Sequence, residues 1–262
     1  MKFHDHKRGP REQVTGGEWI YGRNPVYETL VAGRRTATEM VLPPPAKNEG
    51  DDIAQLRATA AARGIVCRSE ERDRLDKFTH FGHHQGVALK VSPYPYVDFA
   101  DIAAEAESDD NALIVCLDHL EDPQNVGSIL RTALCAGATG VVIPEDRACG
   151  ITPAAVRASA GASEHLKIAR VVNLVRAMKE LKDAGVWFTG LDWGDDAKPY
   201  TSIDFKGKVG LVVGAEGFGI SRLVRDTCDF IAELPMPGEF NSLNAGVAAG
   251  ITLYEILRQR QA

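Results

Sequence analysis

Short apolar runs alternate along the chain with longer segments whose apolar residues recur every three to four positions. Runs of the first kind predict strands, and segments of the second kind predict amphipathic helices. Between residues 111 and 262 the predicted strands are 112–117, 140–143, 166–171, 186–191, 209–213 and 230–234. The predicted helices between them are 126–136, 153–159, 174–184, 221–227 and 245–260. This alternation indicates an α/β fold built on a parallel sheet.

A smaller α/β pattern occupies the first third of the chain. Its predicted strands are 39–42, 65–67 and 87–91, and its predicted helices are 26–32 and 51–62. After it come the sequence Pro93-Tyr94-Pro95-Tyr96 and an acidic, alanine-rich stretch, which is typical of a boundary between domains. We therefore divide the chain into a disordered basic tail (1–17), a small α/β domain (18–92), a linker (93–110) and a larger α/β domain (111–262).

The composition narrows the class of protein. Apolar residues make up 44% and charged residues 25% of the 262 positions, which is ordinary for a soluble globular protein. The net charge of −6 disfavours a protein that coats nucleic acid indiscriminately, although a local basic face is compatible with it. Five scattered cysteines without a Cys-x-x-Cys pair argue against a disulfide framework and a zinc site. With no apolar export signal at the start, we expect a cytoplasmic protein that does not contact membranes.

The stretch 234–251 has an unusual helix start. An apolar strand ends in Pro-Met-Pro-Gly, and a polar loop follows in which Ser242 and Asn244 occupy helix N-cap positions. The first residues of the helix are almost all small, namely Ala245, Gly246, Ala248, Ala249 and Gly250. A glycine inside a helix costs about 0.5–1 kcal/mol relative to alanine, so something must pass close to this surface. Tight helix packing is one explanation, and a ligand or a crossing segment of the backbone is the other.

Two further stretches concentrate polar residues at predicted strand ends. Residues 118–133 place Asn125 at the start of a helix and Arg131 six positions later. Residues 214–221 form a glycine-rich loop whose spacing matches neither the G-x-G-x-x-G fingerprint nor a P-loop. Glu216 within this loop would repel a pyrophosphate but suits a cationic ligand or ribose hydroxyls. The loop therefore disfavours a nicotinamide-dependent dehydrogenase.

A histidine cluster lies at residues 80–84, before the strand at 87–91. Because no cysteine or carboxylate lies within it, we predict no metal site there. We expect its Gln85-Gly86 pair to contact RNA or the neighbouring domain.

The three polar stretches together resemble the SpoU family of RNA ribose 2′-O-methyltransferases, in the SPOUT superfamily. The sequence Asp-Pro-Gln-Asn-Val-Gly-Ser-Ile-Leu-Arg-Thr-Ala (122–133) is similar to the family's first motif, Gly-Ala-Glu-Gly (214–217) to its second, and Leu-Pro-Met (234–236) with Ser-Leu-Asn (242–244) to its third. Residues 19–91 resemble the family's N-terminal substrate-binding domain, of the ribosomal-protein L30e type. The stretch 159–166 fits a subfamily whose best-known member methylates a guanosine of large-subunit ribosomal RNA.

The resemblance implies a catalytic domain with a deep trefoil knot, which is a rare exception to unknotted connections. It also implies that S-adenosylmethionine lies in the knot, held mainly by the backbone of Gly214, Leu234, Met236 and Leu243. The small residues after Asn244 would let one backbone segment cross another.

The resemblance assigns catalysis to Arg131. A guanidinium is a poor base, because lowering its pKa from about 13.8 to about 7 costs roughly 9 kcal/mol. We expect Arg131 to bind an RNA phosphate and polarise the hydroxyl, while that phosphate or water takes the proton. The family implies that Asn125 orients Arg131 or the ribose, that Glu216 holds the target nucleotide or Arg131, and that Ser242 and Asn244 fix the third loop. For Asn125, Ser242 and Asn244 the alternative is a helix-capping or loop-stabilising role.

The implied partner is RNA, with a guanosine of large-subunit ribosomal RNA as the expected target. A transfer-RNA substrate remains an alternative, and so does a catalytically silent ribosome-assembly factor, which would lack Asn125, Arg131 or Glu216. The family also implies a homodimer formed through the last helix, whose apolar stripe contains Val247, Ile251, Tyr254 and Leu257. Core packing within one chain explains that stripe equally well.

Overall fold

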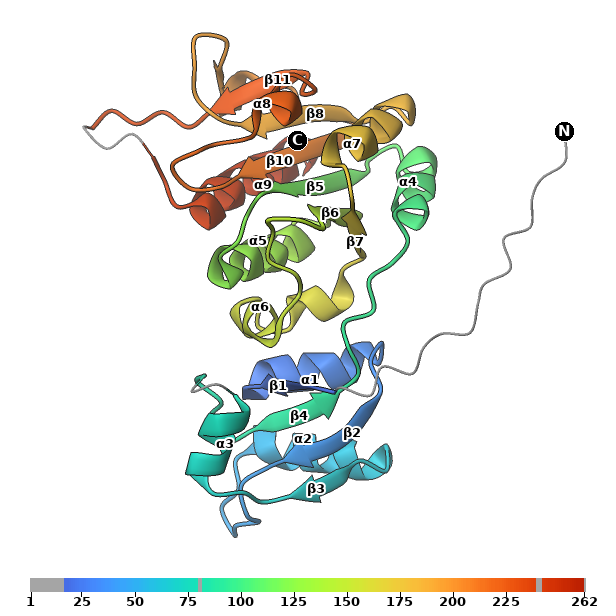
Figure 1. The fold of residues 1–262 in the computed structure, drawn as a ribbon, viewed down its shortest axis with the longest axis vertical. Helices are drawn as coiled ribbons and strands as arrows, with labels where there is room; N and C mark the ends of the chain where they lie inside the picture. The colour runs from blue at the N-terminus through green and yellow to red at the C-terminus, as the bar shows by residue number, and fades with distance from the viewer. Residues whose placement is uncertain (1–16, 80–81, 239–241, 262) are drawn as a thin grey trace, which may run out of the picture.

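Two β-sheets, one in each half of the chain, organise the structure (Figure 1). The structure is a computed structural model that describes residues 17–79, 82–238 and 242–261. The basic tail predicted at residues 1–17 therefore lies almost wholly outside the described residues.

The smaller sheet has four strands in the order β1-β4-β2-β3. Strand β4 pairs antiparallel with β1 and β2, and β2 pairs parallel with β3. The elements of this half are β1 (Glu18–Tyr21), α1 (Arg23–Ala32), β2 (Ala37–Val41), α2 (Asp51–Ala62), β3 (Val66–Arg68), α3 (Arg72–Phe78) and β4 (Ala88–Val91).

The larger sheet has seven parallel strands in the order β7-β6-β5-β10-β8-β11-β9. Its strands are β5 (Leu113–Asp118), β6 (Gly140–Pro144), β7 (Ile168–Val171), β8 (Trp187–Leu191), β9 (Lys198–Pro199), β10 (Val209–Gly214) and β11 (Phe230–Glu233). Its helices are α4 (Phe99–Ser108), α5 (Pro123–Cys135), α6 (Pro153–Ala158), α7 (Leu174–Asp183), α8 (Arg222–Arg225) and α9 (Ala245–Gln261), with 3-10 turns η1 (Ala162–His165) and η2 (Tyr200–Ser202).

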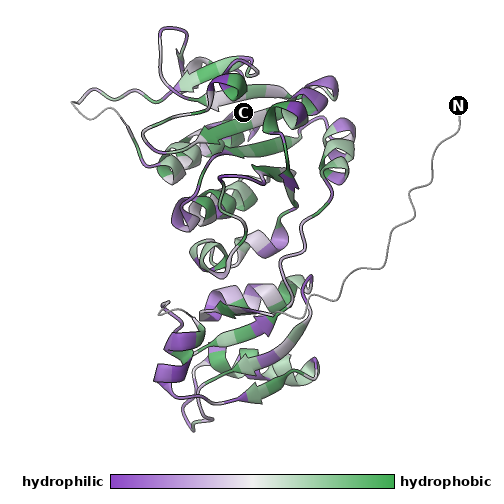
Figure 2. Cartoon of the chain, in the orientation of Figure 1, coloured by the Kyte–Doolittle hydropathy of each residue, from purple (hydrophilic) through white to green (hydrophobic). Residues whose placement is uncertain are grey.

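Helices cover both faces of the larger sheet because its central strands are apolar on both sides. Leu113, Val115 and Leu117 of β5 belong to the core beneath α5 and α9. The intervening Ile114 and Cys116 belong to a second core beneath α4 and α7. The hydropathy of the chain follows this arrangement, with hydrophobic strands inside and polar outer helix surfaces (Figure 2). The uninterrupted apolar run of β5 is what a strand buried on both faces requires.

The segment predicted as a linker contains a helix, and this prediction needs correction. Helix α4 begins after Asp98, whose carboxylate accepts a hydrogen bond from the Ala100 N–H at 3.3 Å. Ile102 and Ala106 are buried in the core shared with α7. Of the acidic residues in this helix, Asp101 and Glu107 are exposed and Glu105 is half-buried. Strand β9, only two residues long and containing Pro199, was not predicted.

Helix boundaries differ from the predictions mainly at the N-termini. Helix α5 begins at Pro123 instead of residue 126, because Asp122 caps it by accepting hydrogen bonds from the N–H groups of Gln124 and Asn125 at 3.0 and 3.3 Å. Helix α1 begins at Arg23 instead of residue 26. Helix α6 begins as predicted at Pro153, where the Thr152 hydroxyl accepts a 3.2 Å hydrogen bond from the Ala155 N–H.

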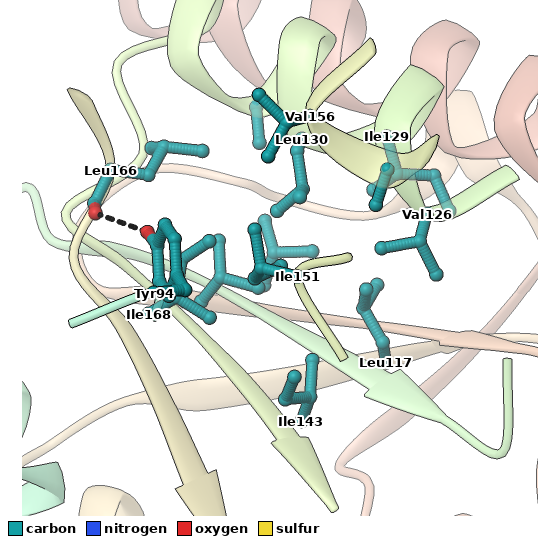
Figure 3. Packing of buried hydrophobic residues seen from close by; sticks show 14 of the residues in the cluster. Tyr94, Leu117, Val126, Ile129, Leu130, Ile143, Ile151, Val156, Leu166 and Ile168 are labelled. Atoms are coloured by element: carbon teal, nitrogen blue, oxygen red, sulfur yellow. Dashed lines mark hydrogen bonds between the residues drawn. The ribbon is translucent and has the colours of Figure 1, made fainter. Parts of the chain in front are cut away.

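A buried polar junction joins the two halves where α1 and β1 meet α6 and η1. The guanidinium of Arg35 contacts Glu164 at 3.3 Å and Glu18 at 2.5 Å, and the Arg35 and Glu164 side chains are fully buried. Burial raises the pKa of the Glu164 carboxyl, and the Arg35 charge opposes that shift. The Tyr94 hydroxyl donates to the Ser163 carbonyl at 2.7 Å and to the Leu166 carbonyl at 3.4 Å, the latter drawn in Figure 3. These contacts tie the first half to the loop before β7.

Within the described residues, none of the helices combines the length and apolarity needed to cross a membrane.

Candidate active site

Helix α5 is held close to α6 by a glycine. A Cβ added at Gly127 would lie 2.4 Å from the Ala158 Cβ and 2.7 Å from the Ser159 backbone nitrogen, so only glycine fits. Ile129 and Leu130 are buried against the sheet. The position of the helix is therefore fixed, and so is that of Asn125, which is 8% exposed in its first turn.

The loop after β10 turns back on itself within five residues. Ala215 and Gly219 form an isolated antiparallel bridge, and the Gly219 N–H donates to the Ala215 carbonyl at 3.0 Å. Gly217 and Gly219 have left-handed backbones with φ of 75° and 67°. A Cβ at Gly214 would lie 2.0 Å from the Gly219 carbonyl oxygen. The glycines of this loop thus serve a tight turn, which leaves Glu216 projecting from it.

The small residues at the start of α9 have two separate functions. Gly246 lies against α5, since a Cβ there would be 3.0 Å from the Ser128 hydroxyl oxygen. Ala245 and Ala248 instead line a cleft at the edge of the sheet. Tight helix packing, one of the two explanations that the sequence offered, is confirmed for Gly246. The other explanation, a ligand or a crossing segment of the backbone, stays a prediction. The predicted Asn244 cap is confirmed, because its side-chain oxygen accepts a hydrogen bond from the Val247 N–H at 3.2 Å.

Asn125, Glu216 and Asn244, three of the predicted site residues, form one hydrogen-bonded cluster. The Asn125 amide donates to Glu216 Oε1 at 3.0 Å, and its own oxygen accepts from the Asn244 amide at 2.7 Å. The Asn244 amide also donates to Glu216 Oε1, as does the Ala245 N–H at 3.2 Å. The partial positive charge of the α9 N-terminus favours the carboxylate there. One oxygen of Glu216 thus has three donors, while no described residue donates to the other, Oε2.

A cleft of about 610 Å³ opens beside this cluster. It lies at the carboxyl ends of β8, β10 and β11, the edge at which open α/β sheets bind ligands. All four residues predicted to hold the cofactor line it, namely Gly214, Leu234, Met236 and Leu243. Glu216 and Ser242 line it as well. Beyond Glu233 the chain leaves the sheet, so the main-chain groups of residues 234–236 lie outside the strand ladder and are available to a ligand.

Arg131 stands apart from the cluster. It lies on α5 six residues after Asn125, which places it roughly 9 Å further along the helix axis. Its side chain is exposed, and no hydrogen bond or ion pair joins its guanidinium to another described residue. The structure therefore brings Asn125, Glu216 and Asn244 together and presents Arg131 to solvent nearby.

Asp192 and Trp193 are among the residues that line the cleft and were not predicted as site residues from the sequence. Asp192 and Trp193 follow β8 directly. A Cβ at Gly219 would lie 2.5 Å from Asp192 Oδ1, and Asp192 forms an ion pair with Arg225 at 2.9 Å. Their position at the end of a predicted strand is the one signal that could have identified them.

The histidine loop contacts the other half of the chain, but not through the Gln85-Gly86 pair that was predicted to do so. The contact uses His83, whose carbonyl accepts a hydrogen bond from Arg157 Nε at 3.3 Å, while the Gln85 side chain accepts one from the Arg23 N–H. His84 is buried, accepts from the Gly86 N–H at 3.0 Å and contacts Asp76 at 3.0 Å. No group of three metal ligands occurs among the described residues, which exclude His80.

Two family models match the chain. Residues 19–97 match the family model described as RNA 2′-O ribose methyltransferase substrate binding. Residues 112–254 match the model of the SpoU rRNA Methylase family. The second match covers more than half of the chain and contains all three motifs. The chain belongs to the SpoU rRNA methylase family.

Relatives of this SpoU methylase extend over nearly its whole length. YacO of Bacillus subtilis, named as a TrmH-family tRNA/rRNA methyltransferase, is 39% identical over 93% of this chain and 96% of its own. An AdoMet-bound rRNA methyltransferase from Sinorhizobium meliloti is similar with a TM-score of 0.76 and 26% identity, over 92% of this chain and 87% of that one. The SpoU methyltransferase AviRb from Streptomyces viridochromogenes, in complex with AdoMet, has a TM-score of 0.75 and 25% identity over 96% and 94%.

A fourth similarity covers less of the chain. It is to a structure that concerns the 2-OH methylation of C/U34 on tRNA. The TM-score is 0.51 and the identity 26%, over 57% of this chain and 97% of that one.

These findings make this SpoU methylase an S-adenosylmethionine-dependent RNA methyltransferase. The cleft fits that cofactor, because its volume lies in the range of small-molecule sites and its lining combines apolar side chains with free main-chain groups. Gly214, Leu234, Met236 and Leu243 are the residues that would hold it.

Proposed function

We propose that this methyltransferase modifies the ribose 2′-hydroxyl of a nucleotide, a guanosine, in large-subunit ribosomal RNA. The observation that supports it is the coverage of the similarities. Both halves of the chain are matched by the rRNA methyltransferase from Sinorhizobium meliloti, whereas the structure concerned with tRNA is matched over 57% of the chain. A match to an rRNA methyltransferase over 92% of the chain, which includes most of the small domain, fits a structured ribosomal target.

The chemistry requires a 2′-oxygen aligned with a methyl group. When bound, S-adenosylmethionine supplies an electrophilic methyl group on a positively charged sulfur. We infer that Glu216 positions the target ribose through Oε2, since Oε1 is already occupied by Asn125, Asn244 and the Ala245 N–H. A rigid carboxylate next to the cleft contributes through orientation and electrostatic preorganisation.

Arg131 binds an RNA phosphate and polarises the 2′-hydroxyl in this proposal. Its exposure supports this role, because a guanidinium without a partner among the described residues can form a bidentate contact with phosphate. The proton leaves to that phosphate or to water. The difference between arginine and lysine tests the bidentate contact, so Arg131→Lys should lower kcat/KM at least 10-fold, and near-full turnover would overturn it.

Methyl transfer from labelled S-adenosylmethionine tests the proposed function. The acceptors are unmodified large-subunit rRNA, small-subunit rRNA and bulk tRNA, each with Arg131→Ala as the control. We expect label on large-subunit rRNA alone and none with the control. Label on tRNA would support the tRNA alternative, and cofactor binding without transfer to any RNA would support a silent assembly factor.

We also propose that the enzyme is a homodimer formed through α9. Val247, Ile251 and Tyr254 are 50%, 38% and 54% exposed, so core packing within the chain does not account for that stripe. Leu257 is half-buried. In sedimentation velocity Ile251→Asp should yield monomers, whereas Val172→Asp, at a residue that is 83% exposed at the end of β7, should leave a dimer. A monomeric wild-type protein would contradict the proposal.

The trefoil knot, the L30e-type N-terminal domain and a cytoplasmic location complete the proposal. The pairing of β10 between β5 and β8, and the hydrogen bond from the Ala245 N–H to Glu216, support a C-terminal segment that passes close to the preceding loops. A crystal structure in which the path of the backbone contains no knot would exclude the trefoil. Fractionation of cells would test the location.

A further inference from the structure

The most exposed large apolar side chain in the described part of the protein lies beside the active-site cluster. Phe218 is 89% exposed, on the turn that follows β10. Exposed aromatic rings are common as isolated surface residues, but this one is two residues from Glu216 in the chain. Since consecutive Cα atoms are 3.8 Å apart, the two Cα atoms are separated by at most about 7.6 Å.

The exposure of Phe218 is imposed by a well-defined turn. Its N–H donates to the Ala215 carbonyl at 3.3 Å, and the next N–H, of Gly219, donates to the same carbonyl at 3.0 Å. The left-handed glycines on either side, Gly217 and Gly219, close the turn without side chains of their own. Because Gly219 lies directly against Asp192, the base of the turn is fixed to the end of β8. The turn therefore holds the Phe218 ring away from the protein.

The ring is at the rim of the cofactor cleft and outside it. Glu216, Gly217 and Gly219 line the cleft, and Phe218 does not. Trp193, which is 56% exposed, does line it and is the aromatic residue placed to contact a molecule in the cleft. Phe218 is therefore exposed to solvent outside the cleft, two residues along the chain from Glu216.

Methylation of a ribose requires a nucleotide that the enzyme can reach. Proteins read RNA mainly at unstacked nucleotides, whose bases they place on aromatic side chains. A base that leaves its neighbours loses stacking energy, and an exposed ring at the site can replace it. A phenyl group has no hydrogen-bonding atoms, so it accepts any base and does not identify guanosine.

We propose that Phe218 is the stacking platform for a nucleobase of the substrate RNA, at the methylated nucleotide or its immediate neighbour. This assignment rests on the proposed 2′-hydroxyl target, because it requires the ribose of that nucleotide to reach Glu216.

Steady-state kinetics with Phe218→Ala, Phe218→Leu and Phe218→Tyr test the platform on the rRNA that the wild type methylates. Phe218→Ala should lower kcat/KM roughly 10- to 100-fold, mainly through the KM for RNA, as for loss of one base–aromatic stack. Phe218→Tyr should keep most of the wild-type kcat/KM, whereas Phe218→Leu should have a kcat/KM close to that of Phe218→Ala. Trp187→Ala is the matched control, since Trp187 is 60% exposed at the opposite end of β8 and should leave the kinetics unchanged.

Transcripts that lack one nucleobase identify what stacks on the ring. Abasic ribose is placed at the methylated position or at either neighbour, and the Phe218→Ala penalty should disappear on one of the three. An equal penalty on all three, or none on the intact RNA, would overturn the proposal. A raised KM for S-adenosylmethionine with unchanged RNA affinity would instead make Phe218 a cover over the cofactor.

The platform can still be tested if the proposed function is wrong. If the wild type methylates no RNA, filter binding of an unmodified large-subunit rRNA transcript still compares the variants. Weaker binding by Phe218→Ala than by Trp187→Ala would then retain the platform, and equal binding would exclude it.

Discussion

Glu216 illustrates how its neighbours define the function of a side chain. From the sequence, its negative charge disfavoured a pyrophosphate site. In the structure, that charge is stabilised by three donors that converge on Oε1. The donors come from α5 and from the start of α9, so the carboxylate connects two motifs. The carboxylate therefore holds the first turn of α5 and the start of α9 together.

Replacing Glu216 with glutamine tests that charge. The variant keeps the size of the side chain, and its amide oxygen can still accept from the three donors, but the NH2 group in place of Oε2 cannot accept from a ribose hydroxyl. We therefore expect kcat to fall about 100-fold, as for the loss of one preorganised polar group. Binding of S-adenosylmethionine, measured by calorimetry, should change little. Glu180→Gln, at an exposed position on α7, should behave as wild type. A Glu216→Gln enzyme with normal kcat would show that the negative charge is dispensable.

At the scale of helices and strands, α5 contributes most to the site. Asp122 starts it, Gly127 brings it against α6, and Asn125 in its first turn joins the hydrogen-bonded cluster. Its apolar stripe was predictable from spacing alone, whereas its start was not, because residues 122–125 are polar and the capping role of Asp122 was not recognised.

Gly127→Ala should destabilise the protein by about 1–2 kcal/mol. Alanine is the better helix former, but its Cβ would collide with the Ser159 backbone, which cannot move as a flexible side chain can. Gly250→Ala in α9 is the matched control, since its Cβ would meet only Thr132 Cγ2, at 3.9 Å. That control should be neutral or slightly stabilising in urea unfolding. Equal effects of the two substitutions would contradict the packing argument.

Strands were predicted well where both faces are apolar, as in β5 and β10. Helix α4 was missed because alanine and acidic residues dominate it and only Ile102 and Ala106 reach the core. The family motifs located residues that line the cleft, such as Gly214 and Met236. Asp192 and Trp193 join that cleft only because β8 lies between β10 and β11, and this strand order depends on tertiary pairing that local sequence does not encode.

In the whole molecule, the junction between the halves depends on a buried charge. Arg35 contacts Glu18 and the Ser92 carbonyl within the small domain, and it reaches the other half through Glu164. The Arg35 and Glu164 side chains are fully buried, so this contact between the halves is closed to water. Removing one partner of such a pair leaves the other charge buried without compensation.

Arg35→Ala should therefore lower the free energy of unfolding by about 3–5 kcal/mol. Arg23→Ala removes an exposed pair with Asp52, whose side chains are 42% and 48% exposed, and should cost less than about 1 kcal/mol. Thermal unfolding of both variants provides the comparison. A loss for Arg35→Ala as small as that for Arg23→Ala would mean that the junction does not stabilise the fold.

The hydrogen-bonded cluster of Asn125, Glu216 and Asn244 joins residues that are 91 and 119 positions apart in the chain. Such a site has no local precursor, because each member is positioned by a different part of the larger sheet. Heat should therefore abolish turnover over the same temperature interval in which that sheet melts, leaving no partly unfolded form that still transfers methyl groups. The turnover that remains after mild heating is thus proportional to the number of catalytic domains that are still folded.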